Sequence, residues 1–144
     1  MFKITIEIIT ILDNAVKHAA IQKALIIEDE KDICYLLTNI LKQKNIVADC
    51  VFTLKDAELT LDEINPEVIF LDNHLPDGMG VNFIRHIKEK CPFSNIIIVT
   101  AHDTSVDREK AMHEGADYFI GKPFSKDIIY WVLEKINLEY YPIV

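Results

Sequence analysis

The sequence contains no uninterrupted apolar run that approaches the roughly 20 residues needed by a membrane-spanning helix. It also lacks a convincing secretory signal, because Glu7, Asp13 and Lys17 interrupt the apolar N-terminal region. The small residues Ala19 and Ala20 come too late in that region to form a clean cleavage site. We therefore expect a cytoplasmic protein that is not attached to a membrane.

Cysteine is scarce and follows no recognisable pattern. Cys34, Cys50 and Cys91 are odd in number, far apart in the chain, and form no C-x-x-C pair. This spacing fits neither a disulfide framework nor a zinc site. The sequence therefore predicts three buried free thiols in a reducing compartment.

Positive charge is also in short supply, with 15 Lys and Arg residues against 23 Asp and Glu residues and a net charge of −8. Direct binding to nucleic acid needs a basic surface, so we do not expect it. Adhesion to an anionic membrane is excluded on the same ground. The length of 144 residues and the hydrophobic fraction of 50% indicate one globular domain with its own core.

From Ala24 onward, short apolar runs alternate with segments of helical periodicity. Thr53, Thr104 or Asp103, and Ser125 are suitable caps for three of the helices. Five such alternations predict an α/β fold, a doubly wound five-stranded parallel sheet covered by helices on both faces. The expected strands are 24–27, 46–52, 66–72, 95–101 and 117–121, and the expected helices are 31–44, 53–64, 80–90, 104–114 and 125–138.

The first 23 residues allow two interpretations. Alternation of apolar and polar residues over 2–8 is typical of a strand, whereas Ile4, Ile8 and Ile11 share one face of a helix. We favour the helix over much of this extension. Its apolar face predicts self-association and hence a homodimer. The plainer alternative is a packing extension, or a start codon placed too far upstream.

Polar side chains follow the ends of four predicted strands: Glu28 and Asp29 the first, Asp72 the third, Thr100 the fourth and Lys122 the fifth. Asp72 alone could simply open a turn. In an open parallel sheet, however, the carboxyl ends of the first and third strands flank one crevice, so three carboxylates converge there. Because three nearby anions repel one another, the sequence predicts a hard divalent cation among them, and Mg²⁺ suits such oxygen ligands.

The residue types at these strand ends also indicate phosphoryl chemistry. A carboxylate such as Asp72 can accept a phosphoryl group as an acyl phosphate, and Mg²⁺ neutralises the charge that develops. Lys122 and the Thr100 hydroxyl can contact the phosphoryl oxygens. The turn after the first strand is acidic and no Gly-rich phosphate loop is present, so the crevice should receive a phosphoryl group and not a nucleotide.

Residues 24–138 resemble the receiver domain of two-component response regulators. The resemblance is carried, in order, by the segments LIIEDE, FLDNHLPDGMG, IIIVTA, GADYF and GKPF. It implies a flavodoxin-like sheet with strand order 2-1-3-4-5, preceded by an extension (1–23) and followed by a short tail (139–144).

The same resemblance implies a role for each matching residue. Asp72 would be the phosphoacceptor, and Thr100 and Lys122 would contact the phosphoryl group. Phe119 would be the aromatic residue that changes orientation together with Thr100 on phosphorylation, and the peptide bond before Pro123 would be cis. The ligands of Mg²⁺ would be the carboxylates of Asp29 and Asp72 and the backbone carbonyl of His74, and Glu28 would bind the ion mostly through water.

We therefore expect a stand-alone phosphoacceptor switch and not an enzyme, apart from self-phosphorylation and autodephosphorylation. A histidine kinase or histidine phosphotransfer protein would donate the phosphoryl group. Because few residues follow the last helix, the output would be a protein contact or onward phosphotransfer.

Three alternatives remain. The chain could be the receiver fragment of a hybrid kinase or transcriptional regulator. It could be a haloacid-dehalogenase-type enzyme, although those enzymes place an acid two residues after the nucleophile, where this chain has His74. It could also be a pseudo-receiver that is not phosphorylated, although all five site residues are present.

Overall fold

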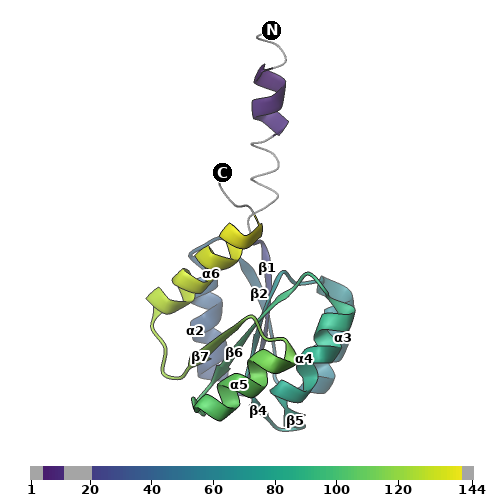
Figure 1. The fold of residues 1–144 in the computed structure, drawn as a ribbon, viewed down its shortest axis with the longest axis vertical. Coiled ribbons are helices and arrows are strands. Elements are labelled where there is room, and N and C mark those ends of the chain that lie inside the picture. The colour runs from purple at the N-terminus through teal and green to yellow at the C-terminus, as the bar shows by residue number, and fades with distance from the viewer. Residues whose placement is uncertain (1–4, 12–20, 141–144) are drawn as a thin grey trace.

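The structure, a computed structural model, describes residues 5–11 and 21–140, in which helices surround a central sheet (Figure 1). The sheet strands are β1 (Lys23–Ile27), β2 (Val47–Val51), β3 (Val68–Leu71), β6 (Asn95–Thr100) and β7 (Tyr118–Gly121). The helices are α2 (Lys31–Lys42), α3 (Leu54–Ile64), α4 (Ile84–Lys90), α5 (Ser105–Glu114) and α6 (Lys126–Tyr140). A hairpin of β4 (His74–Leu75) and β5 (Gly78–Met79) and a 3₁₀ turn, η1 (Gly80–Phe83), follow β3.

The five strands are parallel and lie in the order β2-β1-β3-β6-β7. Because β6 and β7 are the fourth and fifth strands of this sheet, the predicted order 2-1-3-4-5 is confirmed. Three of the predicted helix starts are confirmed by capping bonds. The hydroxyls of Thr53, Thr104 and Ser125 accept from the backbone N–H groups of Asp56, Asp107 and Ile128, respectively.

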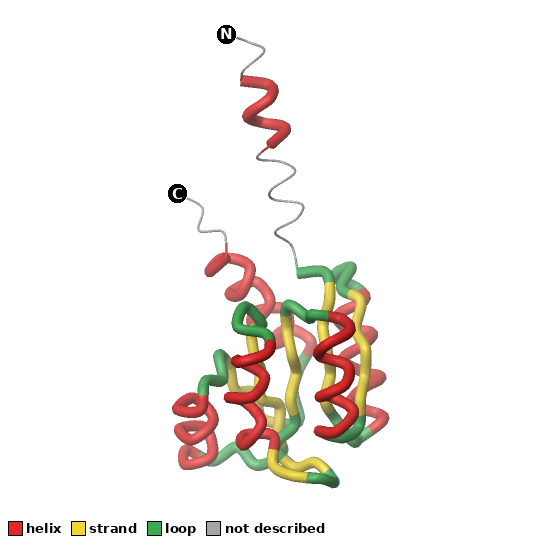
Figure 2. Tube along the Cα trace, turned by 90° about the vertical axis from the view of Figure 1, so that its right-hand side faces the viewer, coloured by secondary structure: helices red, strands yellow, loops and turns green. Residues whose placement is uncertain are grey.

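The core has two layers, one on each face of the sheet, as the helices flanking the strands in Figure 2 show. Helices α2 and α6 cover one face, and α3, α4 and α5 cover the other. Successive residues of β3 serve the two layers in turn: Val68 and Phe70 pack on the first, and Ile69 and Leu71 on the second. This alternation explains why the strand is a continuous apolar run.

Residues 5–11 are helical, which agrees with the helix favoured for part of the extension and not with the strand. Their four isoleucines, Ile6, Ile8, Ile9 and Ile11, are all exposed. The rest of the predicted apolar face lies outside the described residues, and self-association stays a prediction. Within the described part of the chain, no helix has both the length and the apolarity to cross a bilayer.

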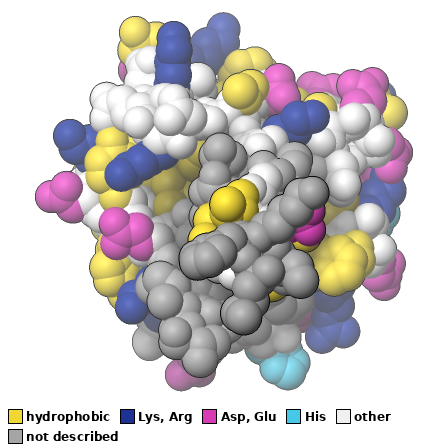
Figure 3. Space-filling model, turned by 90° about the horizontal axis from the view of Figure 1, so that it is seen from above, with side chains coloured by type: hydrophobic (Ala, Val, Ile, Leu, Met, Phe, Trp, Pro, Cys, Tyr) yellow, Lys and Arg dark blue, Asp and Glu magenta, His cyan; other side chains and the backbone are white. Residues whose placement is uncertain are grey.

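The amino ends of the strands lie at the end of the sheet that is seen from above in Figure 3. On this visible face, basic and acidic side chains are interspersed with hydrophobic ones. The carboxyl ends of the strands lie at the other end of the sheet, beside the β4–β5 hairpin.

The prediction of three free thiols is wrong for two of them. Cys34 in α2 and Cys50 in β2 form a disulfide, with their Cα atoms 6.2 Å apart. The two cysteines are 16 positions apart in the sequence and come together because α2 packs against β2, the strand that follows it. The spacing of the cysteines alone does not reveal this contact. Cys91 is free and buried, as predicted. The prediction of a reducing compartment was inferred from three free thiols, so the disulfide removes its basis.

Gly80 generates a prediction about the loop after β3. A Cβ atom at this position would collide with the backbone carbonyl oxygen of Asp72. We expect Gly80→Ala to lower the free energy of unfolding by about 1–3 kcal/mol, since the backbone would have to shift. Urea denaturation measures the change, and Asn82→Ala in the same turn is the control because Asn82 is exposed. Equal stability of the two variants would contradict this packing.

Candidate functional site

The acidic residues of the predicted site are placed by the backbone ladder of the sheet. The N–H of Glu28 donates to the carbonyl of Val51 at 3.0 Å, and the N–H of Asp72 donates to the carbonyl of Ile27 at 2.9 Å. These bonds extend the pairing of β1 with both of its neighbours by one residue. As a result, one carboxylate oxygen from each of Glu28, Asp29 and Asp72 lies within 4.8 Å of the others.

Two members of this cluster are buried, which changes their protonation. Glu28 is 2% exposed and Asp72 is 5% exposed, whereas Asp29 is exposed. Burial raises the pKa of Glu28 from 4.5 to about 7, against the opposing effect of a hydrogen bond from Lys122. Burial also raises the pKa of Asp72, and the negative charge of Asp29 contributes in the same direction.

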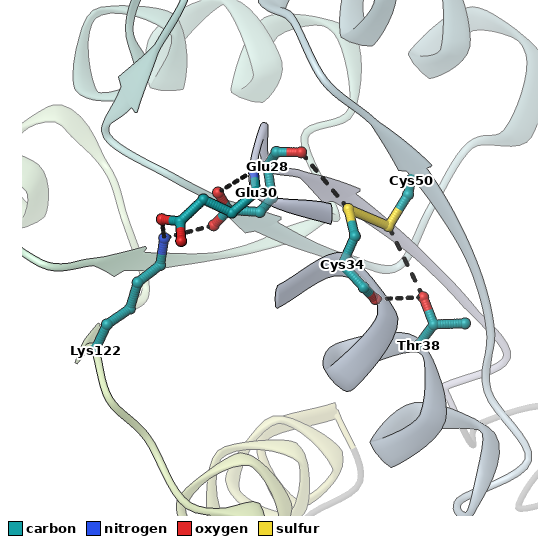
Figure 4. Close-up of a disulfide and its surroundings, with 6 residues drawn as sticks. All are labelled: Glu28, Glu30, Cys34, Thr38, Cys50 and Lys122. Atoms are coloured by element: carbon teal, nitrogen blue, oxygen red, sulfur yellow. Dashed lines mark hydrogen bonds and ion pairs between the residues drawn. A yellow bond between two sulfur atoms is a disulfide. The ribbon is translucent and has the colours of Figure 1, made fainter. Parts of the chain in front are cut away.

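Lys122, which directly follows the edge strand β7, contacts the carboxylates of this cluster. Its Nζ lies 2.7 Å from Glu28 Oε2 and 3.1 Å from Glu30 Oε1 (Figure 4). The same Nζ lies 3.8 Å from Asp72 Oδ2. Burial by itself lowers the pKa of Lys122, but the hydrogen bond with Glu28 and the charge of Asp72 raise it overall. The amine is therefore a charged donor held among carboxylates.

Glu30 is the partner that the sequence interpretation missed. Its backbone N–H donates to Glu28 Oε1 at 3.0 Å, and its own carboxylate reaches Lys122. The available signal was its place in the acidic turn after the first strand, where only Glu28 and Asp29 were given roles. Its contact with Lys122 joins residues 92 positions apart, which the sequence does not reveal.

Two further predicted residues, Thr100 and His74, lie around the same crevice. Thr100 is fully buried at the end of β6, and its Oγ1 accepts from the N–H of His102 at 3.3 Å. The imidazole rings of His74 and His102 are in contact, with centroids 4.2 Å apart. The Lys122–Pro123 peptide bond is cis. A cavity of about 210 Å³ is lined by Asp29, Glu30, Asp72, His74, Thr100, Ala101, His102 and Lys122.

Phe119 does not line that cavity. It is half-buried in β7 and packs against the core layer of α3, α4 and α5. The guanidinium carbon of Arg108 lies 4.8 Å from the centre of its ring, and Arg108 is paired with Asp103 at 2.8 Å. Its outer face is thus covered by a cation that the sequence interpretation did not assign.

The donor atoms of the site fit a hard divalent cation. Three carboxylates supply oxygen ligands, and the cavity beside the exposed Asp29 leaves room for water. Mg²⁺ is usually held by one or two carboxylates together with several waters, so two of these acids would bind it directly and the third through water. Glu28, Asp29 and Asp72 are the residues that would hold the ion.

Comparison with known proteins defines the class of this site. The sequence profile of the response regulator receiver domain matches residues 24–134. Since the match covers most of the chain, the protein belongs to the receiver domain family of two-component response regulators. Proteins of this family generally act in signalling.

Solved structures agree with this assignment. The beryllofluoride-activated NtrC4 receiver domain dimer is 37% identical with a TM-score of 0.77, and the match covers 82% of this chain and 98% of that one. A two-component response regulator from Clostridium difficile is 27% identical with a TM-score of 0.77, covering 80% and 94%. The BeF₃-activated DrrB receiver domain is 28% identical with a TM-score of 0.73, covering 81% and 97%.

The raised pKa of Glu28 generates a prediction about stability and pH. Because its folded-state pKa of about 7 lies above the ordinary 4.5, the folded protein favours the protonated form. The stabilising effect of that proton is fully present below pH 4.5 and is lost as the pH rises through 7. In buffer without divalent cations, we expect Glu28→Gln to be more stable than wild type at pH 8, by on the order of 2 kcal/mol.

Urea denaturation across this pH range measures the difference. The advantage of the variant should disappear below pH 4.5 and should shrink when Mg²⁺ is added, since the ion stabilises the ionised carboxylate. An advantage that does not change with pH would contradict the assignment to this carboxyl group.

Proposed function

We propose that the protein is a phosphoacceptor switch in which Asp72 receives a phosphoryl group from a phosphohistidine. One observation carries the proposal: the buried carboxylate of Asp72 lies at a strand end beside two further acids, with Lys122 Nζ 3.8 Å away and a cavity in front. Family membership supports a histidine kinase or histidine phosphotransfer protein as the donor.

The transfer assigns a task to each residue. An oxygen of Asp72 attacks phosphorus, the bond between phosphorus and the donor imidazole breaks, and an acyl phosphate forms. Bound Mg²⁺ would supply charge neutralisation on the phosphoryl oxygens. Lys122 donates a charge-assisted hydrogen bond to one of these oxygens, and the Thr100 hydroxyl donates to another. The buried position of Asp72 limits the access of water to the product.

The direct test of acceptance is intact-mass spectrometry after incubation with acetyl phosphate and Mg²⁺. We expect one phosphoryl adduct on the wild-type protein and none on Asp72→Asn, because an amide is a poor nucleophile. Asp49→Asn, which changes an exposed acid outside the cavity lining, is the matched control and should be labelled. Labelling of Asp72→Asn, or no labelling of the wild type where a receiver standard is labelled, would overturn the proposal.

We propose that the conformational response passes through Thr100 and Phe119. A phosphoryl group on Asp72 would attract the Thr100 hydroxyl, and the space that Thr100 leaves would admit the Phe119 ring. The change would alter the surface formed by α5, β7 and α6. The contact between Arg108 and the Phe119 ring favours the present orientation, since a cation over an aromatic face contributes about 0.5–1 kcal/mol at exposed sites.

Removal of the guanidinium group tests this part of the proposal. We expect Arg108→Ala to increase the initial rate of labelling by acetyl phosphate about two- to fivefold, as Phe119 is released. Arg85→Ala is the control, because Arg85 also forms an ion pair at the surface, with Glu114 at 2.6 Å, but does not contact Phe119. Equal rates in the two variants would argue against the role of Arg108.

The altered surface formed by α5, β7 and α6 also suggests the kinds of downstream partner. Protein contact by the altered surface, or onward transfer to another histidine, would provide the output of the chain or of a longer hybrid kinase or transcriptional regulator. The NtrC4 relative forms a receiver dimer. Together with the four exposed isoleucines of residues 5–11, this supports a homodimer as part of the proposal.

A further inference from the structure

The disulfide lies directly behind one of the proposed metal ligands. Cys34 Sγ is 3.6 Å from the backbone carbonyl oxygen of Glu28 (Figure 4). On the other side of the same residue, the Glu28 N–H donates to the carbonyl of Val51, the neighbour of Cys50 in β2. The two elements joined by the disulfide therefore both contact the backbone of Glu28.

The contact between Cys34 and Glu28 depends on the oxidation state of sulfur. In the disulfide, Cys34 Sγ carries no proton and cannot donate to the Glu28 carbonyl. In the dithiol, its S–H can donate a weak hydrogen bond across the same 3.6 Å. Reduction therefore breaks the covalent bond between α2 and β2 and allows a weak hydrogen bond from the Cys34 thiol to the Glu28 carbonyl.

Reduction of the disulfide would affect the acidic site through Glu28 and Glu30. The Glu28 side chain contacts Lys122 at 2.7 Å, and the backbone N–H of Cys34 donates to the carbonyl of Glu30 at 3.1 Å. Both acids lie on the short turn between β1 and α2. A cross-link at the first turn of α2 therefore restrains this turn, and its loss should increase the conformational freedom of the carboxylates.

We propose that Cys34 and Cys50 form a thiol–disulfide exchange site through which a cellular dithiol controls the affinity of the acidic site for Mg²⁺. This inference rests on the metal-dependent function proposed above. Cys50 is half-buried in an edge strand, and accessible disulfides are more often regulatory than deeply buried ones, which fits a control element.

The exchange starts at Cys50, which is half-buried in the edge strand β2, whereas Cys34 is only 5% exposed. A thiolate of the dithiol attacks Cys50 Sγ, and the sulfur–sulfur bond breaks so that Cys34 leaves as a thiolate and takes up a proton. The second thiol of the reductant then attacks the mixed disulfide and releases Cys50, which is also protonated. Two electrons pass to the protein, and the reductant becomes a disulfide.

The test uses the full chain in two states, air-oxidised and reduced with dithiothreitol. Intact mass after alkylation counts the free thiols of each state, and isothermal titration calorimetry measures the Mg²⁺ dissociation constant. We expect the oxidised protein to bind Mg²⁺ about fivefold more tightly than the reduced protein, a typical coupling between sites. Cys50→Ser should bind with the weaker affinity in both conditions, and Cys91→Ser should behave as wild type.

Equal Mg²⁺ affinity in the two states would overturn the inference, as would three alkylated cysteines in the oxidised protein. A change in affinity that persists in Cys50→Ser would also overturn it. Failure of the proposed function is distinguishable, because it appears as no phosphoryl adduct in either state. If Cys50→Ser does not fold, the two wild-type states still decide the question.

Discussion

The ion pair between Lys122 and Glu28 is the interaction on which the site depends. Parallel strands bring their carboxyl ends to one edge, so the fold itself crowds carboxylates together, and burial makes their charges costly. Lys122 comes from the end of β7, at the edge of the sheet, and reaches an acid after β1, across the ends of β3 and β6. The pair compensates part of the cost of burial and places a cation beside Asp72, where a phosphoryl group would need it.

Two connections lead away from this pair, one toward each edge of the sheet. On the β2 side, the turn that holds Glu28 and Glu30 continues into α2, which is cross-linked to β2 by the disulfide. On the β7 side, the loop after Thr100 carries Asp103, which pairs with Arg108 over the ring of Phe119. We propose that the first connection controls the conformational freedom of the metal ligands. The second would transmit the phosphorylation state of Asp72 to a protein-binding surface.

The sequence was sufficient for the sheet and for the residues at its strand ends. Buried parallel strands are continuous apolar runs, and the polar residue that ends each run is visible without a structure, as Asp72 after Val68–Leu71 illustrates. Contacts between distant side chains were not predictable. The Cys34–Cys50 bond depends on how α2 packs on β2, the contact of Glu30 with Lys122 spans 92 positions, and the placement of Arg108 over Phe119 depends on α5 lying beside β7.

The central claim is that Asp72 and Mg²⁺ together form a site for a phosphoryl group. Binding of beryllofluoride, a phosphoryl analogue that activates two of the relatives, tests it without a covalent product. The measurement is ¹⁹F NMR of the protein with beryllium, fluoride and Mg²⁺. The account predicts bound fluoride resonances for the wild type that vanish without Mg²⁺ and in Asp72→Asn. Resonances that persist in Asp72→Asn, or none in the wild type, would contradict it.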